Sequence, residues 1–162
     1  MKKTLSLLLF LVAVPLWVGE SFAAEPLKTQ EMEVLGVAAD PQSGQPLVLL
    51  RGKEDKTREL TMFIGPFEAQ SIMAPLQRFH PPRPLTHDLM LSVIGKLKAK
   101  VKRVVITDLK ENTYYALVHL ETGGSEVTLD SRPSDAIALA LRAGVPIFAE
   151  ERAFLRPLRE FH

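Results

Sequence analysis

One stretch of the chain, residues 133–143, is apolar on almost every side of the helix that it predicts. Pro133 opens the stretch and Gly144 follows it, and these residue types favour the first position and the end of a helix. Asp135 and Arg142 form the only polar line along it, because residues seven apart lie on the same side of a helix. A helix with so little polar surface has to be buried on most sides. The sequence therefore places this helix in a core.

The rest of the chain alternates between short strands and helices. The order is three strands, two helices, three strands, the apolar helix and a last short strand, which predicts an α+β single domain with a mixed or antiparallel sheet and three main helices. We expect strands at 31–37, 46–50, 59–64, 101–107, 114–120, 126–130 and 145–148, helices from Pro66 to Pro75 and from Thr86 to about Ala99, and turns at 108–112 and 122–125.

The second helix has a clear pattern of its own. Thr86 is of a type that caps helices, so we expect it to be the N-cap. Leu89, Met90, Val93, Ile94 and Leu97 fall on one face at helical spacing, which predicts a core-facing stripe. The same spacing turns Asp88 towards solvent and leaves His87 on the flank of the stripe, partly covered.

The first residues resemble an export signal. Lys2 and Lys3 precede an apolar run, and Ser21-Phe22-Ala23 offers small residues where a signal peptidase cleaves. The run is short for a membrane span and contains Pro15. We expect a signal peptide at 1–23, a leader at 24–30, a domain at 31–155 and a tail at 156–162, with the mature protein periplasmic or secreted and free of the membrane.

The charge balance limits the partners that the protein can bind. Removing Lys2 and Lys3 from the 20 basic residues and Glu20 from the 19 acidic ones leaves 18 of each. High-affinity nucleic-acid binders are usually clearly basic, so any nucleic-acid contact has to use a local patch. The chain has no cysteine, which excludes disulfides and a lipoprotein anchor.

Acidic and basic side chains gather around the start of the apolar helix. The sequence has no His-Glu-x-x-His motif, no Gly-x-Ser-x-Gly motif and no phosphate-binding glycine loop. Asp130 and Asp135, with Asp108 at the end of another strand, could hold Mg²⁺ or Mn²⁺ for phosphodiester hydrolysis. Arg132 or Arg83 could bind phosphate oxygens.

The same residues also have structural interpretations. Asp135 in a first helical turn is favourable with the helix dipole, and Arg132 could simply pair with Asp130 or Asp135. His87 beside an apolar stripe could be a packed histidine or a general acid or base. A third possibility is a binder of small molecules or peptides that uses the stiff connector at Pro81–Pro84 as a wall.

Four segments together resemble the bifunctional nuclease domain family. They are Ile64–Ala69, Arg83–Asp88, Val104–Leu109 and Asp130–Ala140, and the resemblance covers about residues 32–153. It implies an α+β fold, nuclease activity on DNA and RNA, and a homodimer. The polar residues of this sequence at matching motif positions are Glu68, Arg83, Thr86, His87, Asp88, Asp108, Asp130, Ser131, Arg132, Ser134 and Asp135.

The sequence and the resemblance together predict an exported, metal-assisted nuclease. Asp130 and Asp135, with Asp108, would hold the cation, and His87 would move a proton alongside the two catalytic carboxylates. The residues expected to bind the phosphate of the substrate are Arg83, Arg132, Ser131 and Ser134. The alternative is a non-enzymatic binding or oligomerisation domain. A site predicts carboxylates converging in an open cleft, and a scaffold predicts carboxylates saturated by N–H groups or arginine.

Overall fold

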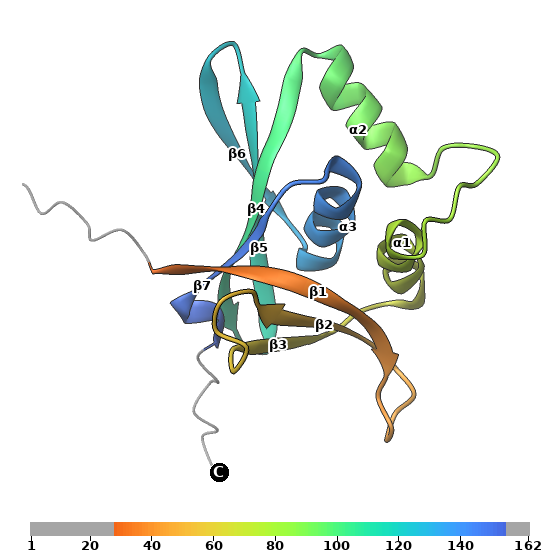
Figure 1. Ribbon diagram of the computed structural model, residues 1–162, viewed down its shortest axis with the longest axis vertical. Coiled ribbons are helices and arrows are strands. Elements are labelled where there is room, and N and C mark those ends of the chain that lie inside the picture. Colours follow the sequence, from red (N-terminus) through yellow and green to blue (C-terminus); the bar gives the residue numbers. More distant parts are fainter. Residues whose placement is uncertain (1–27, 155–162) are drawn as a thin grey trace, which may run out of the picture.

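The computed structural model describes residues 28–154 (Figure 1). The predicted signal peptide, most of the leader and the predicted tail lie outside the described residues. The first strand begins at Thr29, so Thr29 and Gln30 belong to the sheet and not to the leader. The strand expected from residue 31 therefore starts two residues earlier.

A seven-stranded sheet forms the base of the molecule, in the order β3-β2-β1-β7-β4-β5-β6. Only β4 and β7 pair in parallel, and every other neighbouring pair is antiparallel. With the three helices, this mixed sheet confirms the predicted α+β class. The strands are β1 (Thr29–Ala39), β2 (Pro46–Gly52), β3 (Glu59–Phe63), β4 (Ala99–Lys110), β5 (Thr113–Thr122), β6 (Ser125–Ser131) and β7 (Ile147–Glu150).

The helices are α1 (Pro66–Leu76), α2 (Thr86–Lys96) and α3 (Pro133–Ala143), with a short 3-10 turn, η1 (Glu151–Phe154). Helix α3 packs on β4 and β5, and α1 and α2 pack on α3 (Figure 1). All residues from Ala136 to Ala140 are buried, which confirms the core position predicted for this helix. In the described part of the chain no helix has the length and apolarity to cross a bilayer.

Two tight hairpins set the register of β4, β5 and β6. Glu111 and Asn112 have φ values of 48° and 60°, and Gly123 and Gly124 have 57° and 80°. Two successive positive φ values are the geometry of the two-residue turns that join antiparallel strands. The predicted glycine turn is confirmed, whereas the turn predicted to start at Asp108 is wrong for its first three residues. Strand β4 runs on to Lys110 because the turn needs only two residues.

The predicted stripe on α2 does not face the core. Leu89, Val93 and Leu97 are exposed, whereas Ile94 packs against the core cluster. The first turn of α2 is covered on the side away from this stripe, where His87 is buried and Asp88 is half-buried. The expectation of a solvent-facing Asp88 is therefore wrong, because α2 meets α3 through the polar residues of its first turn.

The ends of α2 also differ from the expected ones. Leu85 is the N-cap and Thr86 is the first helical residue, so the expected cap by Thr86 is wrong. The backbone N–H of Leu85 instead donates to the Asp88 carboxylate, 2.8 Å away. A carboxylate in the first turn can satisfy a free N–H group there, which leaves no need for a capping hydroxyl. The helix ends at Lys96 and not near Ala99, because Lys98 has a positive φ of 58° that turns the chain into β4.

An ion-pair cluster fixes the edge strand β6 to the sheet. Arg103 of β4 donates to both carboxylate oxygens of Glu126 at 2.8 and 2.7 Å, and the His119 ring lies 2.8 Å from the same carboxylate. The Arg103 guanidinium and then the His119 ring lower the pKa of Glu126 from 4.5 to about 2. The charged carboxylate therefore ties three neighbouring strands together.

Candidate functional site

The Asp135 carboxylate lies between a histidine and an arginine. One oxygen lies 3.2 Å from Nε2 of His87, and the other accepts a hydrogen bond from Nε of Arg132 at 2.6 Å. Nη1 of Arg132 donates in turn to Glu68 at 3.0 Å. These four residues, His87, Asp135, Arg132 and Glu68, form a continuous polar chain that we name the Asp135 network.

The network is assembled from the starts of three helices. Glu68 lies in the first turn of α1, His87 in the first turn of α2 and Asp135 in the first turn of α3, with Arg132 as the N-cap of α3. Helix starts carry unpaired N–H groups and a partial positive charge, which stabilise nearby carboxylates. Glu68 and Asp135 are therefore in places where a charged carboxylate is favourable.

The four side chains differ strongly in their access to solvent. The exposed fraction is 65% for Arg132, 29% for Asp135 and 23% for Glu68, but only 8% for His87. Nδ1 of His87 is buried and has no hydrogen-bond partner among residues 28–154. A molecule bound at this surface can therefore touch Arg132, Asp135 and Glu68, whereas His87 acts on it only through Asp135.

Arg132 is the electrostatic centre of the network. Asp135 first, and Glu68 second, raise the pKa of the Arg132 guanidinium above its usual value. The guanidinium lies between the two carboxylates, in the position that a cation bridging them would take. With a neutral histidine the network carries one negative charge in excess, so it does not by itself form a strongly cationic phosphate site.

The predicted metal set of Asp130, Asp135 and Asp108 is not assembled. Asp130 of β6 lies opposite Leu117 of β5 in the register of the two strands. Its side chain projects from the sheet face opposite to the core residues that α3 covers. Asp108 binds Lys110 at 2.9 Å, and this ion pair is the main reason why the pKa of its carboxyl is lowered. Within residues 28–154 no group of three or more His, Asp or Glu side chains could hold a metal ion. These residues do not fit the predicted Mg²⁺ or Mn²⁺ site.

The four side chains predicted to bind phosphate do not converge on one place. Arg83 is exposed on the connector before α2. The Ser131 hydroxyl donates to the backbone carbonyl of Arg132 at 3.1 Å, and Ser134 is buried in the first turn of α3. Of the four, only Arg132 takes part in the Asp135 network. Glu68 was not among the residues predicted to form the site, although its position just after Pro66 in a helix start was a visible signal.

A second polar network, centred on Arg142, also joins the three helices. Arg142 of α3 is only 6% exposed, and its Nε donates to Asp88 at 2.8 Å. Its Nη1 donates to the carbonyl of Ser71 in α1 at 2.7 Å and to that of Ala138 at 2.9 Å. The polar line that the sequence predicted on α3 thus meets the first turn of α2 twice, Asp135 at His87 and Arg142 at Asp88.

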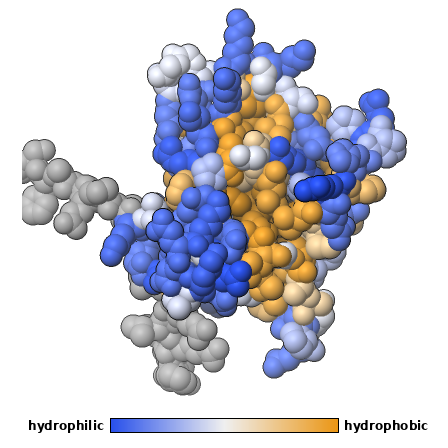
Figure 2. All heavy atoms as spheres, viewed as in Figure 1, coloured by the Kyte–Doolittle hydropathy of each residue, from blue (hydrophilic) through white to orange (hydrophobic). Residues whose placement is uncertain are grey.

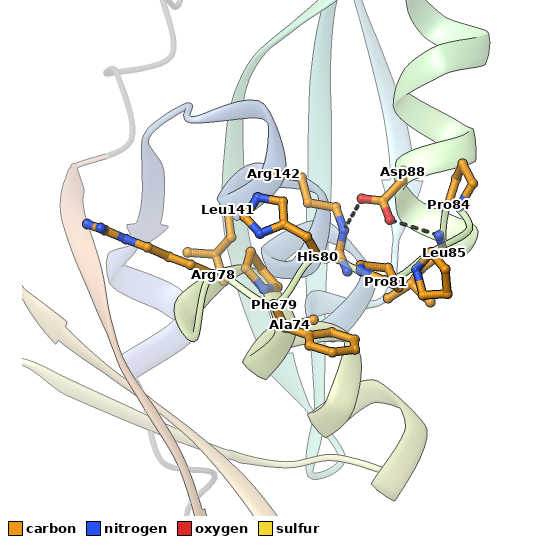
Figure 3. Close-up of a pocket in the computed structure, with 12 residues that line it drawn as sticks. Ala74, Arg78, Phe79, His80, Pro81, Pro84, Leu85, Asp88, Leu141 and Arg142 are labelled. Carbon is orange, nitrogen blue, oxygen red and sulfur yellow. Dashed lines mark hydrogen bonds and ion pairs between the residues drawn. The ribbon is translucent and has the colours of Figure 1, made fainter.

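A groove with a volume of about 570 Å³ opens beside the second network (Figure 3). Pro81, Pro82 and Pro84 of the connector form part of its lining, as do Phe79 and His80. Figure 3 shows the Arg142 guanidinium directed at Asp88 on one side of this groove. The stiff connector therefore does line a groove, which is the feature that the binder hypothesis used.

Comparison with known proteins identifies the family. The profile of the Bifunctional nuclease domain matches residues 48–156. The chain belongs to this family. An uncharacterised protein of Mycobacterium tuberculosis is 41% identical over 121 residues, which are 75% of this chain and 71% of the relative. Bifunctional nuclease 2 of Oryza sativa subsp. japonica is 32% identical over 111 residues, 66% of this chain and 34% of the plant protein.

The bifunctional nuclease match contains the complete Asp135 network. Glu68, His87, Arg132 and Asp135 all fall within residues 48–156, whereas β1 precedes them. Bifunctional nuclease 1 of Arabidopsis thaliana is 25% identical over 118 residues, 67% of this chain and 36% of the relative. The chain therefore spans about a third of these plant bifunctional nucleases.

Proposed function

We propose that the protein is a nuclease that hydrolyses phosphodiester bonds of DNA or RNA at the Asp135 network. The observation that carries this proposal is the solvent-exposed Arg132 guanidinium, which lies between the carboxylates of Asp135 and Glu68. The buried His87 ring contacts the Asp135 carboxylate from the inner side. Relatives named bifunctional nucleases support the reaction class.

Each residue of the network has a role that its position allows. Arg132 donates to phosphate oxygens with the N–H groups that Asp135 and Glu68 leave free. Asp135 takes a proton from a water molecule whose oxygen forms a bond to phosphorus, while the bond from phosphorus to the leaving ester oxygen breaks. Solvent water protonates the leaving oxygen. His87 orients the Asp135 carboxylate from the buried side, so it is a positioning residue.

A cleavage assay tests this proposal. Protein beginning at Ala24 is incubated with single-stranded DNA, duplex DNA and RNA in Mg²⁺, in Mn²⁺ and in chelator, beside the Asp130→Ala/Asp135→Ala double variant. We expect cleavage by the wild type that disappears in a still-folded double variant. Loss of cleavage in chelator would establish a divalent-cation requirement, and equal cleavage by both proteins would contradict the proposal.

One observation favours a non-enzymatic domain as the second candidate. Asp88, Asp108 and Asp135 are each already bound to an arginine, a lysine or a backbone N–H group. Saturated carboxylates are what a scaffold predicts, because each of these three charges then has a partner within the fold. In that case no cation would give cleavage, and the substitutions would lower stability alone.

We also propose that the protein forms a homodimer through one apolar surface. Strand β6 is an edge strand of the sheet that residues 28–154 form, so within that part of the chain its outer backbone groups have no strand partner and could pair with another chain. Val127 and Leu129 project from the sheet face that the helices cover, and α2 lies over the same face. An apolar area also runs down the middle of the face shown in Figure 2. The exposed apolar side chains of the two elements are Leu89, Met90, Val93, Leu97, Val127 and Leu129.

Charges placed on this surface should prevent association. We expect wild-type protein to sediment as a dimer at micromolar concentration and the Val93→Glu/Leu129→Glu variant as a monomer, because pairing two such surfaces would bury the new charges. Phe63→Glu is the matched control, since Phe63 is an exposed apolar residue on the other edge strand and is 62% exposed. A wild type that is monomeric over the whole concentration range would refute the dimer.

A further inference from the structure

One short segment departs strongly from the neutral charge of the chain. Residues 96–103 carry five cationic side chains and no acidic one. They join the end of α2 to the start of β4. The five are Lys96, Lys98, Lys100, Lys102 and Arg103.

The segment lies at one end of the molecule. Figure 1 shows the end of α2 and the start of β4 at the top of the view, beside the turn between β5 and β6. Hydrophilic side chains project from the same end in Figure 2. Lys98 has a positive φ of 58° at the reversal from helix to strand. From Lys96 to Lys100 the backbone spans at most about 14 Å, so the long side chains reach the same end of the molecule, Lys96 from α2 and Lys100 from the sheet face opposite to the helices.

Two carboxylates lie close to this segment, and both are already bound. Glu121 accepts from Lys102 at 2.8 Å, and Glu126 accepts from Arg103 at 2.7 Å. Lys100 lies opposite Glu121 in the register of β4 and β5 but is not bonded to it. The segment therefore keeps an excess of three positive charges.

The three other lysines are exposed, and of these Lys100 lies near enough to Glu121 to contribute to the lowered pKa of that carboxyl. Lys96, Lys98 and Lys100 make no ion pair or hydrogen bond with any residue between 28 and 154. In contrast, three lysines elsewhere in the described chain have carboxylate partners: Lys53 binds Glu31, Lys56 binds Glu33 and Lys110 binds Asp108. A group of free ammonium groups beside saturated carboxylates is a site for an external polyanion.

We propose that Lys96, Lys98 and Lys100 form a surface that binds the phosphate backbone of nucleic acid. This inference rests on the proposed nuclease function and adds to it the part of the protein that holds the substrate. Lysine ammonium groups bind phosphates without reading bases, and they displace the counterions that surround the strand. The surface would give the neutral protein the local positive charge that nucleic-acid binding needs.

The surface is separate from the Asp135 network. His87 lies in the first turn of α2, and Lys96 is the last residue of the same helix. The two residues are therefore near opposite ends of a helix that is about 16 Å long. Only a substrate of several nucleotides can reach both places. The lysines should therefore affect substrate affinity and KM but leave the chemical step unchanged.

A salt titration with matched variants tests the inference. Binding of single-stranded DNA is measured in chelator at increasing salt concentration for the wild type and for Lys96→Gln/Lys98→Gln/Lys100→Gln. Each neutralised phosphate contributes about 0.7 to the slope of log affinity against log salt for a single strand, so the triple variant should lose about 2 from that slope. The control is Lys53→Gln/Lys56→Gln/Lys110→Gln, which removes the same charge from paired lysines and should keep the wild-type slope.

The outcomes separate this inference from the proposed function. Equal slopes in the two triple variants, with cleavage by the wild type intact, would overturn the lysine surface and leave the nuclease proposal standing. Binding that depends on the three lysines without any cleavage would support the surface and contradict the nuclease. If both hold, the lysine variant should raise KM for long oligonucleotides with kcat unchanged.

Discussion

Replacing Arg142 with alanine is expected to lower the free energy of unfolding by about 2–4 kcal/mol, because it breaks a partly buried ion pair and two hydrogen bonds to carbonyl oxygens. Arg142 is almost fully buried and donates to Asp88 and to the carbonyls of Ser71 and Ala138. The change leaves the half-buried Asp88 carboxylate without its guanidinium. It also removes the donor that ties α1 and α2 to α3.

Urea denaturation followed by circular dichroism measures this loss. Arg83→Ala is the matched control, because Arg83 is an exposed arginine, and its loss should change stability by no more than about 0.5 kcal/mol. If the free energy of unfolding of Arg142→Ala stays within about 1 kcal/mol of the wild-type value, the Arg142 network does not stabilise the packing of the helices.

The second large effect concerns activity. Asp135→Asn should lower kcat/KM for cleavage of nucleic acid by about 10²–10⁴-fold, the usual contribution of a general acid or base. The amide keeps the size of the side chain but cannot take a proton from water. It also weakens the bonds that hold Arg132 and His87, at 2.6 and 3.2 Å.

Asp130→Asn tests whether Asp130 acts together with Asp135 at the start of α3 or whether Asp135 acts without it. The two aspartates are close in sequence, but Asp130 projects from the opposite face of the sheet and is exposed. We expect Asp130→Asn to stay within about threefold of the wild type, since a change of less than about 1 kcal/mol is typical of an exposed site. Equal losses in the two variants would instead restore the sequence-based pairing of Asp130 with Asp135. Thermal melting of both variants verifies that they are folded.

Local sequence signals predicted the elements that depend on nearby residues. The proline at Pro133, the glycine at Gly144 and the apolar run between them define α3, and the structure confirms its burial. Gly123-Gly124 gave the β5–β6 hairpin because few other residue types adopt two positive φ values so easily. These features are determined within a few residues, so a single sequence is enough to find them.

Periodicity failed on α2 for a physical reason. The spacing of Leu89, Val93 and Leu97 shows that they share a face, but it does not show what covers that face. In the described chain this face meets solvent, and α2 instead contacts α3 through His87 and Asp88. A stripe on a helix is a core stripe only if another element lies against it.

The candidate site shows the same division. By itself the sequence determined that Asp135 and Arg142 share one line of a buried helix and that Arg132 precedes it, because these relations depend on helical spacing alone. Only the tertiary structure decided their partners: Glu68 for Arg132, His87 for Asp135 and Asp88 for Arg142. Alternation along β6 already placed Asp130 on the face opposite to Val127 and Leu129, but only the tertiary structure decided that α3 covers the face of Val127 and Leu129 and so leaves Asp130 on the far side. Partners that lie dozens of residues apart are brought together by the packing of three helix starts, which no local pattern encodes.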